Sequence, residues 1–168
     1  MISKKSILKD KDTGHLTSND LAMQIRLLKW RDLRFTKKLK NENRNYFFYK
    51  EKLTWKTHLK WYYKYMKTSD NFFFIIEFGK DKYGTIGIRF RDGYWDIYSV
   101  SRNKSVTYQK DLMFNAMLKI TSFFDQSHIF RCLVLINNPA LFWYKKIGFV
   151  VNREFCNYSE LHFQQSQT

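Results

Sequence analysis

The chain has 168 residues and carries 30 Lys and Arg against 15 Asp and Glu, a formal net charge of +15. This length predicts one domain, residues 1–168, with a core of its own. No apolar run reaches 18 residues and no apolar segment follows the first Met, so we expect no transmembrane helix, no signal peptide, no membrane partner and a cytoplasmic location.

Positive charge is concentrated in the first part of the chain. Residues 1–70 carry 18 basic and 7 acidic side chains, whereas residues 71–168 carry 12 and 8. Such a field favours anionic partners. Basic and aromatic side chains alternate from Arg44 to Lys50, which is also typical of a single-stranded nucleic-acid surface. The same spacing suits a core and no binding module accompanies it, so we expect no nucleic-acid partner.

The residues that commonly bind metals show no ligand spacing. Cys132 lies in an apolar run and Cys156 near the end, which favours reduced thiols over a disulfide framework. The histidines are far apart in sequence, at His15, His58, His128 and His162. We therefore expect no metal site.

The first predicted elements are a short edge strand and a helix. Residues 6–10 favour a strand, and the helix begins at Ser18. Leu21, Ile25 and Leu28 recur at helical spacing, which predicts that this helix extends to residue 32. Residues 35–45 are highly charged and predict a loop or a frayed helix.

A second helix is predicted after Thr54, which is suited to be its N-cap. Trp55, Leu59, Tyr62 and Met66 form one stripe at helical spacing, which predicts the buried face. Three further side chains lie alongside that stripe: His58, Trp61 and Tyr65.

An antiparallel meander follows. The continuous apolar run 72–78 predicts an interior strand, and residues 84–91 alternate as a second strand. Asp92 and Gly93 are typical of a tight hairpin turn, and residues 94–100 form the return strand.

The second half of the chain begins with a polar, basic segment, 101–110. A helix begins at Asp111, and its apolar residues cover more than one face, so we expect it to be well buried. The run 129–136 then predicts a strand, followed by a helix at 140–147.

The turn before this last helix contains Asn138, a suitable N-cap, and Pro139, which fits the first helical position. Gly148 suits the left-handed residue that ends a helix. Two more strands are predicted at 151–154 and about 155–163. Together the elements predict an α/β fold, more closely an α+β mixed sheet.

The stretch around the last helix resembles a family signature. Asn137, Ala140, Tyr144 and Gly148-Phe149 are similar to the Asn-x-x-Ala-x-x-x-Tyr-x-x-x-Gly-Phe pattern of the GCN5-related N-acetyltransferases (GNAT). The alternative is a core βαβ unit without chemistry. The resemblance implies the GNAT acyl-CoA N-acyltransferase fold, a twisted, mostly antiparallel sheet with one parallel splayed strand pair, flanked by helices.

The first half resembles one subgroup of that family. WRD at 30–32, KNENRNYFF at 40–48, His58 with Trp61, and GTIG at 84–87 look like the pattern of enzymes that acetylate nucleotide-linked amino sugars, as in pseudaminic acid and surface-polysaccharide pathways. Related patterns occur in acetyltransferases of ribosomal-protein N-termini.

The resemblance implies that acetyl-CoA lies in a wedge between strands 94–100 and 129–136. Backbone groups left unpaired there would bind the pantetheine amides, and the pyrophosphate would lie on the helix N-terminus at 104–111. The cofactor-binding residues implied in this way are Tyr98, Ser99, Val100, Lys104, Ser105, Thr107, Tyr108, Gln109, Lys110, Asn137 and Tyr144.

The phosphate loop departs from the family pattern. Members usually have Arg/Gln-x-x-Gly-x-Gly/Ala there, but residues 104–109 contain no glycine, and Tyr108 or Gln109 would crowd the site. Hydroxyls and cations remain to bind phosphate: Arg102, Lys104, Ser105, Thr107 and Lys110. This predicts a rebuilt loop, with a catalytically silent binding protein as the alternative.

The resemblance also implies catalytic roles. Tyr144 would protonate the leaving thiolate, since a phenol with a pKa of about 10 keeps its proton at neutral pH; the alternative is a packed core tyrosine. The candidate general bases are Glu77, Asp96 and His58. Asn137 would bind the pantetheine arm or cap the strand. The acceptor's phosphates would be bound by Arg31, Lys40 and Arg44.

These features predict a cytoplasmic acetyl-CoA-dependent N-acetyltransferase. The amine would attack directly, and the acceptor would be a nucleotide-activated amino sugar of surface-polysaccharide biosynthesis. The alternatives are a protein N-terminus, a small antibiotic-like amine, or a silent member of the fold. The partner would be a small molecule, and a homodimer stays open.

Overall fold

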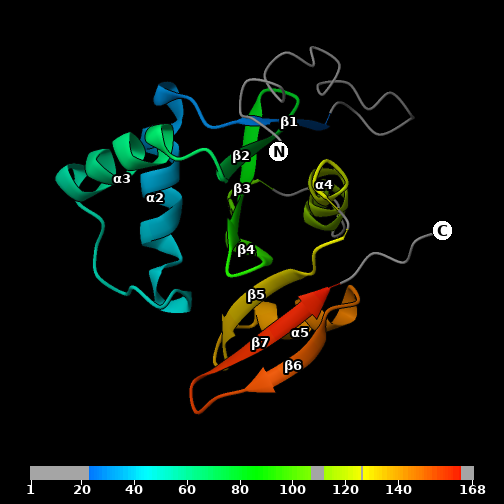
Figure 1. Ribbon diagram of the computed structural model, residues 1–168. Coiled ribbons are helices and arrows are strands. Elements are labelled where there is room, and N and C mark those ends of the chain that lie inside the picture. The colour runs from blue at the N-terminus through cyan, green and yellow to red at the C-terminus, as the bar shows by residue number, and fades with distance from the viewer. Residues whose placement is uncertain (1–22, 107–111, 126, 164–168) are drawn as a thin grey trace.

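The computed structural model describes residues 23–106, 112–125 and 127–163 as one mixed seven-stranded sheet with helices on both faces (Figure 1). The strand order is β1-β2-β3-β4-β5-β7-β6. The strands are β1 (Met23–Leu27), β2 (Asn71–Phe78), β3 (Asp81–Arg91), β4 (Tyr94–Arg102), β5 (Phe130–Leu135), β6 (Val150–Glu154) and β7 (Tyr158–Phe163). The helices are η1 (Trp30–Asp32), α2 (Leu33–Glu42), η2 (Arg44–Tyr46), α3 (Trp55–Lys67), α4 (Leu112–Thr121) and α5 (Ala140–Lys146).

The predicted mixed sheet is confirmed. Neighbouring strands are antiparallel apart from β4 and β5, which are parallel. Figure 1 shows α2 and α3 on one side of the β1–β4 region and α4 on the other. Among the described residues, no helix is both long and apolar enough to cross a bilayer.

Strand β2 explains why its sequence is continuously apolar. Phe72, Phe74 and Ile76 belong to the large core that includes α4, whereas Phe73 and Ile75 belong to the smaller core under α2 and α3. Both faces of the strand are therefore covered, as expected for an interior strand. The predicted β3–β4 hairpin is also confirmed, because Asp92 and Gly93 have φ values of 53° and 81°.

The predicted helix through residue 32 is wrong over Met23–Leu27, whereas Trp30–Asp32 form the short 3-10 helix η1. Met23, Ile25 and Leu27 are buried and alternate with partly exposed residues, which is the period of a strand. This strand, β1, pairs antiparallel with β2. Ile25 and Leu28 fit the helical spacing by chance. The predicted strand at 6–10 and the helix start at 18–20 lie outside the described residues.

Helix α2 occupies most of the segment predicted as a loop or a frayed helix, and the loop alternative is wrong. Leu33, Thr36 and Leu39 recur every three residues and form its buried face. Its charged side chains occupy the remaining surface, which obscured the pattern in the sequence.

Helix α3 begins as predicted, because the hydroxyl of Thr54 accepts a hydrogen bond from the backbone N–H of Thr57 at 3.2 Å. The predicted buried stripe was partly wrong. Trp55 and Met66 are 49% and 54% exposed. The buried face instead contains His58, Tyr62 and Tyr65.

The end of the chain follows the prediction with one change. The side-chain oxygen of Asn138 accepts from the backbone N–H of Ala140 at 2.9 Å, and Gly148 ends α5 with a φ of 101°. Strand β7 begins at Tyr158, later than predicted, because the backbone N–H of Phe155 donates to the carbonyl of Tyr158 and closes a turn. Strand β7 pairs with both β5 and β6.

Candidate active site

The parallel strands β4 and β5 separate near the middle of β4. Their paired residues are Trp95–Phe130, Asp96–Arg131 and Ile97–Cys132. Beyond Ile97 and Cys132, β4 continues to Arg102 and β5 to Leu135, and no further pair joins them in the described ranges. The other edge of β5 stays paired with β7 along its whole length. The expected separation of the two strands is therefore confirmed.

A bulge in β4 coincides with the separation. Between the pairs Gly87–Tyr98 and Thr85–Ser101, β4 has one more residue than β3. Ser99 lies in this bulge with a φ of 50°, and its carbonyl accepts a hydrogen bond from the Thr85 hydroxyl at 2.9 Å. An extra residue bends a strand at the point of insertion, so the bulge directs the end of β4 away from β5.

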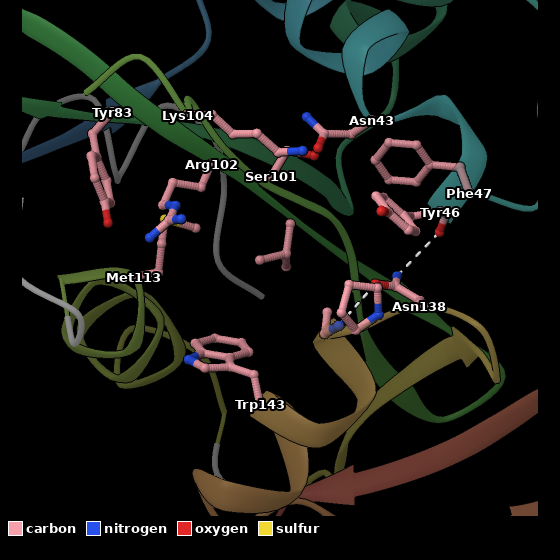
Figure 2. A pocket seen from close by; sticks show the side chains of 13 residues that line it. Asn43, Tyr46, Phe47, Tyr83, Ser101, Arg102, Lys104, Met113, Asn138 and Trp143 are labelled. Atoms are coloured by element: carbon pink, nitrogen blue, oxygen red, sulfur yellow. Dashed lines mark hydrogen bonds between the residues drawn. The ribbon is translucent and has the colours of Figure 1, made fainter. Parts of the chain in front are cut away.

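A cavity of about 380 Å³, the first cavity, lies beside the separated strand ends (Figure 2). Its walls come from the end of β4, from α4, from the start of α5 and from the segment after α2. Val100, Met113 and Trp143 supply apolar surface, and Arg102 and Lys104 supply positive charge. No carboxylate lines this cavity among the described residues.

Asn138 ties two distant segments together across the first cavity. Its side-chain nitrogen donates to the backbone carbonyl of Tyr46 at 3.2 Å, while its oxygen caps α5 (Figure 2). Sequence reasoning predicted the cap and missed the contact with Tyr46, since nothing local signals a bond across 92 residues. The neighbouring Asn137 is exposed and does not line the cavity.

Tyr144 lies in the core beside the point of separation. It is 5% exposed, packs against Phe149 with ring centroids 5.1 Å apart, and does not line the first cavity. Burial raises the pKa of its phenol well above 10, and the nearby Cys132 thiol adds to the rise. Tyr144 therefore keeps its proton at neutral pH.

Glu77 and Asp96 are occupied by guanidinium partners. Glu77 pairs with Arg26, whose nitrogens lie 2.6 and 2.9 Å from its two oxygens. Asp96 accepts from Nε of Arg131 at 2.7 Å. Neither carboxylate lines the first cavity or the cavity between the sheet and the helices α2 and α3.

The structure disperses the other predicted binding residues. Arg31 and Arg44 are exposed and line neither cavity. Ser105 is exposed and also lies outside the cavity linings. The remaining loop predictions, Thr107, Tyr108, Gln109 and Lys110, lie outside the described residues.

A second cavity of about 430 Å³ lies between the sheet and the pair α2 and α3. It contains the predicted residue Lys40, together with Tyr98 and Ser99, which were predicted to bind the cofactor. It shares Phe47 and Ser101 with the first cavity. The two cavities therefore adjoin at the bulge of β4.

His58 lines the second cavity and is only 3% exposed. Its Nε2 lies 3.1 Å from the carbonyl oxygen of Leu33 and 3.0 Å from the hydroxyl of Thr36. Because a carbonyl can only accept, Nε2 carries the proton and Nδ1 is bare. Nδ1 has no hydrogen-bond partner in the described part of the chain.

The charge state of His58 follows from its surroundings. Burial lowers the pKa of the imidazole below 6.5, and the positive charges of Lys40 and Lys37 lower it further. The imidazole is therefore neutral at pH 7, with one nitrogen able to accept a proton. Sequence reasoning named Glu77, Asp96 and His58 as candidate bases, and His58 is the one of these three that lines a cavity.

Comparison with known proteins identifies the fold. No model of a known protein family matches the sequence, and no curated protein is significantly similar to it. Solved structures do match. The chain has the fold of the GCN5-related N-acetyltransferases.

Three of the matching structures illustrate this. Spermidine N-acetyltransferase from Vibrio cholerae, in complex with CoA and spermine, has a TM-score of 0.72 at 22% identity, covering 86% of this chain and 96% of that one. FdhC, a nucleotide-linked sugar GNAT, has a TM-score of 0.70 at 17% identity, covering 86% and 87%. The PaiA N-acetyltransferase from Thermoplasma acidophilum, in complex with coenzyme A, has a TM-score of 0.65 at 15% identity, covering 86% and 99%.

Proposed function

We propose that the protein is an acetyl-CoA-dependent N-acetyltransferase. The observation that carries this proposal is the separation of β4 and β5 beyond Ile97 and Cys132, with a cavity beside the gap that no Asp or Glu of the described residues lines. The apolar walls suit a pantetheine arm, and Arg102 and Lys104 suit the phosphates of a coenzyme. Structures of the same fold in complex with CoA support the proposal.

Bound acetyl-CoA supplies an acetyl group on a thioester, which an amine attacks directly. A carbon–nitrogen bond forms and the carbon–sulfur bond breaks. His58 lines the second cavity, and its unprotonated Nδ1 would receive the proton that the substrate ammonium loses, directly or through water. Tyr144 holds a proton at neutral pH and would donate it to the leaving sulfur. The second proton, which the attacking nitrogen loses as it becomes an amide, would restore the phenol through water.

We further propose a nucleotide-activated amino sugar as the acceptor, used in surface-polysaccharide biosynthesis in the cytoplasm. The resemblance of residues 30–61 to that subgroup and the structural similarity to FdhC support this substrate. A polyamine is the second candidate, because the similar Vibrio cholerae enzyme acts on spermidine. The positive charge of the second cavity supports the nucleotide-activated sugar over the polyamine.

Thermal unfolding with and without acetyl-CoA tests the proposed donor. A ligand that binds only the folded state at 100 times its dissociation constant adds about 2.7 kcal/mol of stability. We expect a higher unfolding temperature with acetyl-CoA, and release of free thiol when an acceptor amine is added. Absence of any shift would favour a silent binding protein over the transferase.

A further inference from the structure

The second cavity is positively charged. Its lining includes the side chains of Lys40 and Arg89 and the neutral imidazole of His58, and no Asp or Glu lines it among the described residues. A cavity with cations and no carboxylate attracts anions and repels ammonium groups.

Of the two cations, Lys40 has less of its positive charge balanced by a carboxylate. Its side chain is largely withdrawn from water, and burial alone lowers its pKa. Its Nζ lies 5.1 Å from the centre of the Phe47 ring. No ion pair between Lys40 and a carboxylate forms within the described ranges. A desolvated ammonium without a counter-ion is unfavourable, so an anionic ligand at this position gains a strong interaction.

Arg89 shares the carboxylate of Asp96 with another cation, Arg131. Its Nε lies 3.5 Å from Asp96, which also accepts from Arg131 at 2.7 Å. The guanidinium lies 5.1 Å from the centre of the Tyr98 ring, and Nε makes no hydrogen bond to a described residue. One carboxylate between two guanidiniums leaves positive charge at the cavity.

Half of the remaining lining residues are aromatic. The five aromatic side chains are Phe47, Tyr49, Trp61, Phe73 and Tyr98, and the other five lining residues are Thr36, Leu53, Thr85, Ser99 and Ser101. Flat rings of this kind stack with a planar ligand group, and they also attract cations. A cation–π contact is weaker than the repulsion from two nearby cations in a partly dry site, so the walls favour a planar group attached to an anion.

The position of the cavity completes the argument. It adjoins the first cavity at Phe47 and Ser101, where β4 bulges. A ligand anchored at Lys40 therefore directs its other end toward the separated strands.

We propose that the second cavity is the acceptor site and that Lys40 and Arg89 make it select an amine attached to an anionic group, phosphate or carboxylate, and reject polyamines. This proposal rests on the proposed function, because an acceptor site presupposes a transferase. Binding tests it without turnover, so failure of acetyl transfer and failure of the selectivity are distinguishable.

The experiment measures binding by calorimetry with CoA present in excess, so that the phosphates of a titrant cannot bind in the first cavity. The titrants are uridine diphosphate, succinate and spermidine, of which the first two distinguish phosphate from carboxylate. We expect at least one anion to bind and spermidine not to bind. Lys40→Met should raise the dissociation constant of the anion that binds by about tenfold or more.

Lys60→Met is the matched control, because Lys60 is exposed on α3 and lines neither cavity. Lys40→Glu should abolish anion binding and allow spermidine to bind, with an unchanged circular-dichroism spectrum showing that the variant folds. Tighter binding of spermidine than of both anions to the wild type would overturn the proposal. Equal anion affinity in the wild type and Lys40→Met would do so as well.

Discussion

Ile97 of β4 and Cys132 of β5 face each other as the last residue pair that joins the two parallel strands. Tyr144 lies close enough to Cys132 for the thiol to raise its phenol pKa. The phenol is therefore held, protonated, beside the point where the strands separate. This position is the one that the proposed role of Tyr144 as proton donor requires.

Tyr144→Phe should remove the proton donor and little else. The ring remains to pack against Phe149, so stability and acetyl-CoA affinity should stay unchanged. Loss of a general acid typically costs about 10² to 10⁴ in turnover. Steady-state thiol release and a calorimetric titration with acetyl-CoA measure the two effects separately. Tyr63→Phe, at an exposed position on α3, is the control, and unchanged turnover in Tyr144→Phe would exclude the acid role.

Arg102 and Lys104 should contribute to coenzyme affinity through their charge. Replacing each by Met should weaken acetyl-CoA binding by roughly three- to tenfold, because both side chains are exposed and their attraction is screened by water and salt. The loss should shrink as ionic strength rises. Lys146→Met, in the last turn of α5, is the control because it lies outside the first cavity. A salt-independent loss would contradict a charge effect.

The sequence predicted well those elements whose signals are local. The β3–β4 hairpin follows from Asp92 and Gly93, and the end of α5 from Gly148, because each needs a positive φ. Strand β2 was predicted because both of its faces are apolar. The β4–β5 gap was predicted only through a family resemblance, since the bulge at Ser99 has no local signature.

The errors came from segments whose environment is distant in the sequence. Strand β1 was predicted as a helix, because only its pairing with β2 shows that its buried residues alternate with the period of a strand. The cavities draw residues from segments up to 100 positions apart, such as Asn43 and Trp143 in the first. Arg89 was missed for the same reason: nothing near it in the sequence shows that α2 and α3 enclose a cavity over β3.

Asp32 shows how a motif residue can be structural. It belongs to the WRD segment, yet it is fully buried, with Arg26 at 2.6 Å and Lys82 at 2.7 Å. Burial would raise its pKa, but hydrogen bonds from these two cations outweigh it and hold the pKa well below 3.8. The carboxylate therefore joins β1 to β3.

Asp32→Asn should destabilise the protein strongly. It leaves two partly buried cations without their shared anion, which typically costs about 3–5 kcal/mol of unfolding free energy. Urea unfolding at pH 7 measures the loss. Glu42→Gln, which removes the exposed Lys38–Glu42 pair, should change stability by less than about 0.5 kcal/mol. Equal losses of unfolding free energy in the two variants would show that the buried ion pairs of Asp32 stabilise the protein no more than an exposed pair does.

Gly87 allows Tyr98 to lie flat against β3. A Cβ atom at position 87 would lie 2.5 Å from the Tyr98 ring, so Gly87→Ala must displace that ring from the wall of the second cavity. We expect a higher KM for the acceptor, with unchanged affinity for acetyl-CoA. Arg91→Ala is the control, because Arg91 is an exposed residue of the same strand and lines neither cavity. Equal KM values for Gly87→Ala and the wild type would exclude Tyr98 from the acceptor site.

His58 should make stability depend on pH in a predictable direction. Burial lowers its folded-state pKa below 6.5, so the unfolded chain binds a proton more readily than the folded protein. Stability is therefore complete above about pH 6.5 and falls as the pH decreases through that value, by at most about 1.4 kcal/mol per pH unit for one group. Urea unfolding at pH 7.5, 6.5 and 5.5 measures the slope.

His58→Gln should remove this part of the slope, although it lowers stability at every pH by disturbing the contacts with Leu33 and Thr36. His128→Gln is the control, since that side chain is 38% exposed. The slope rather than the absolute stability is decisive, because packing losses are independent of pH. If His58→Gln keeps the wild-type slope between pH 7.5 and 5.5, the folded-state pKa of the imidazole is not lowered by burial.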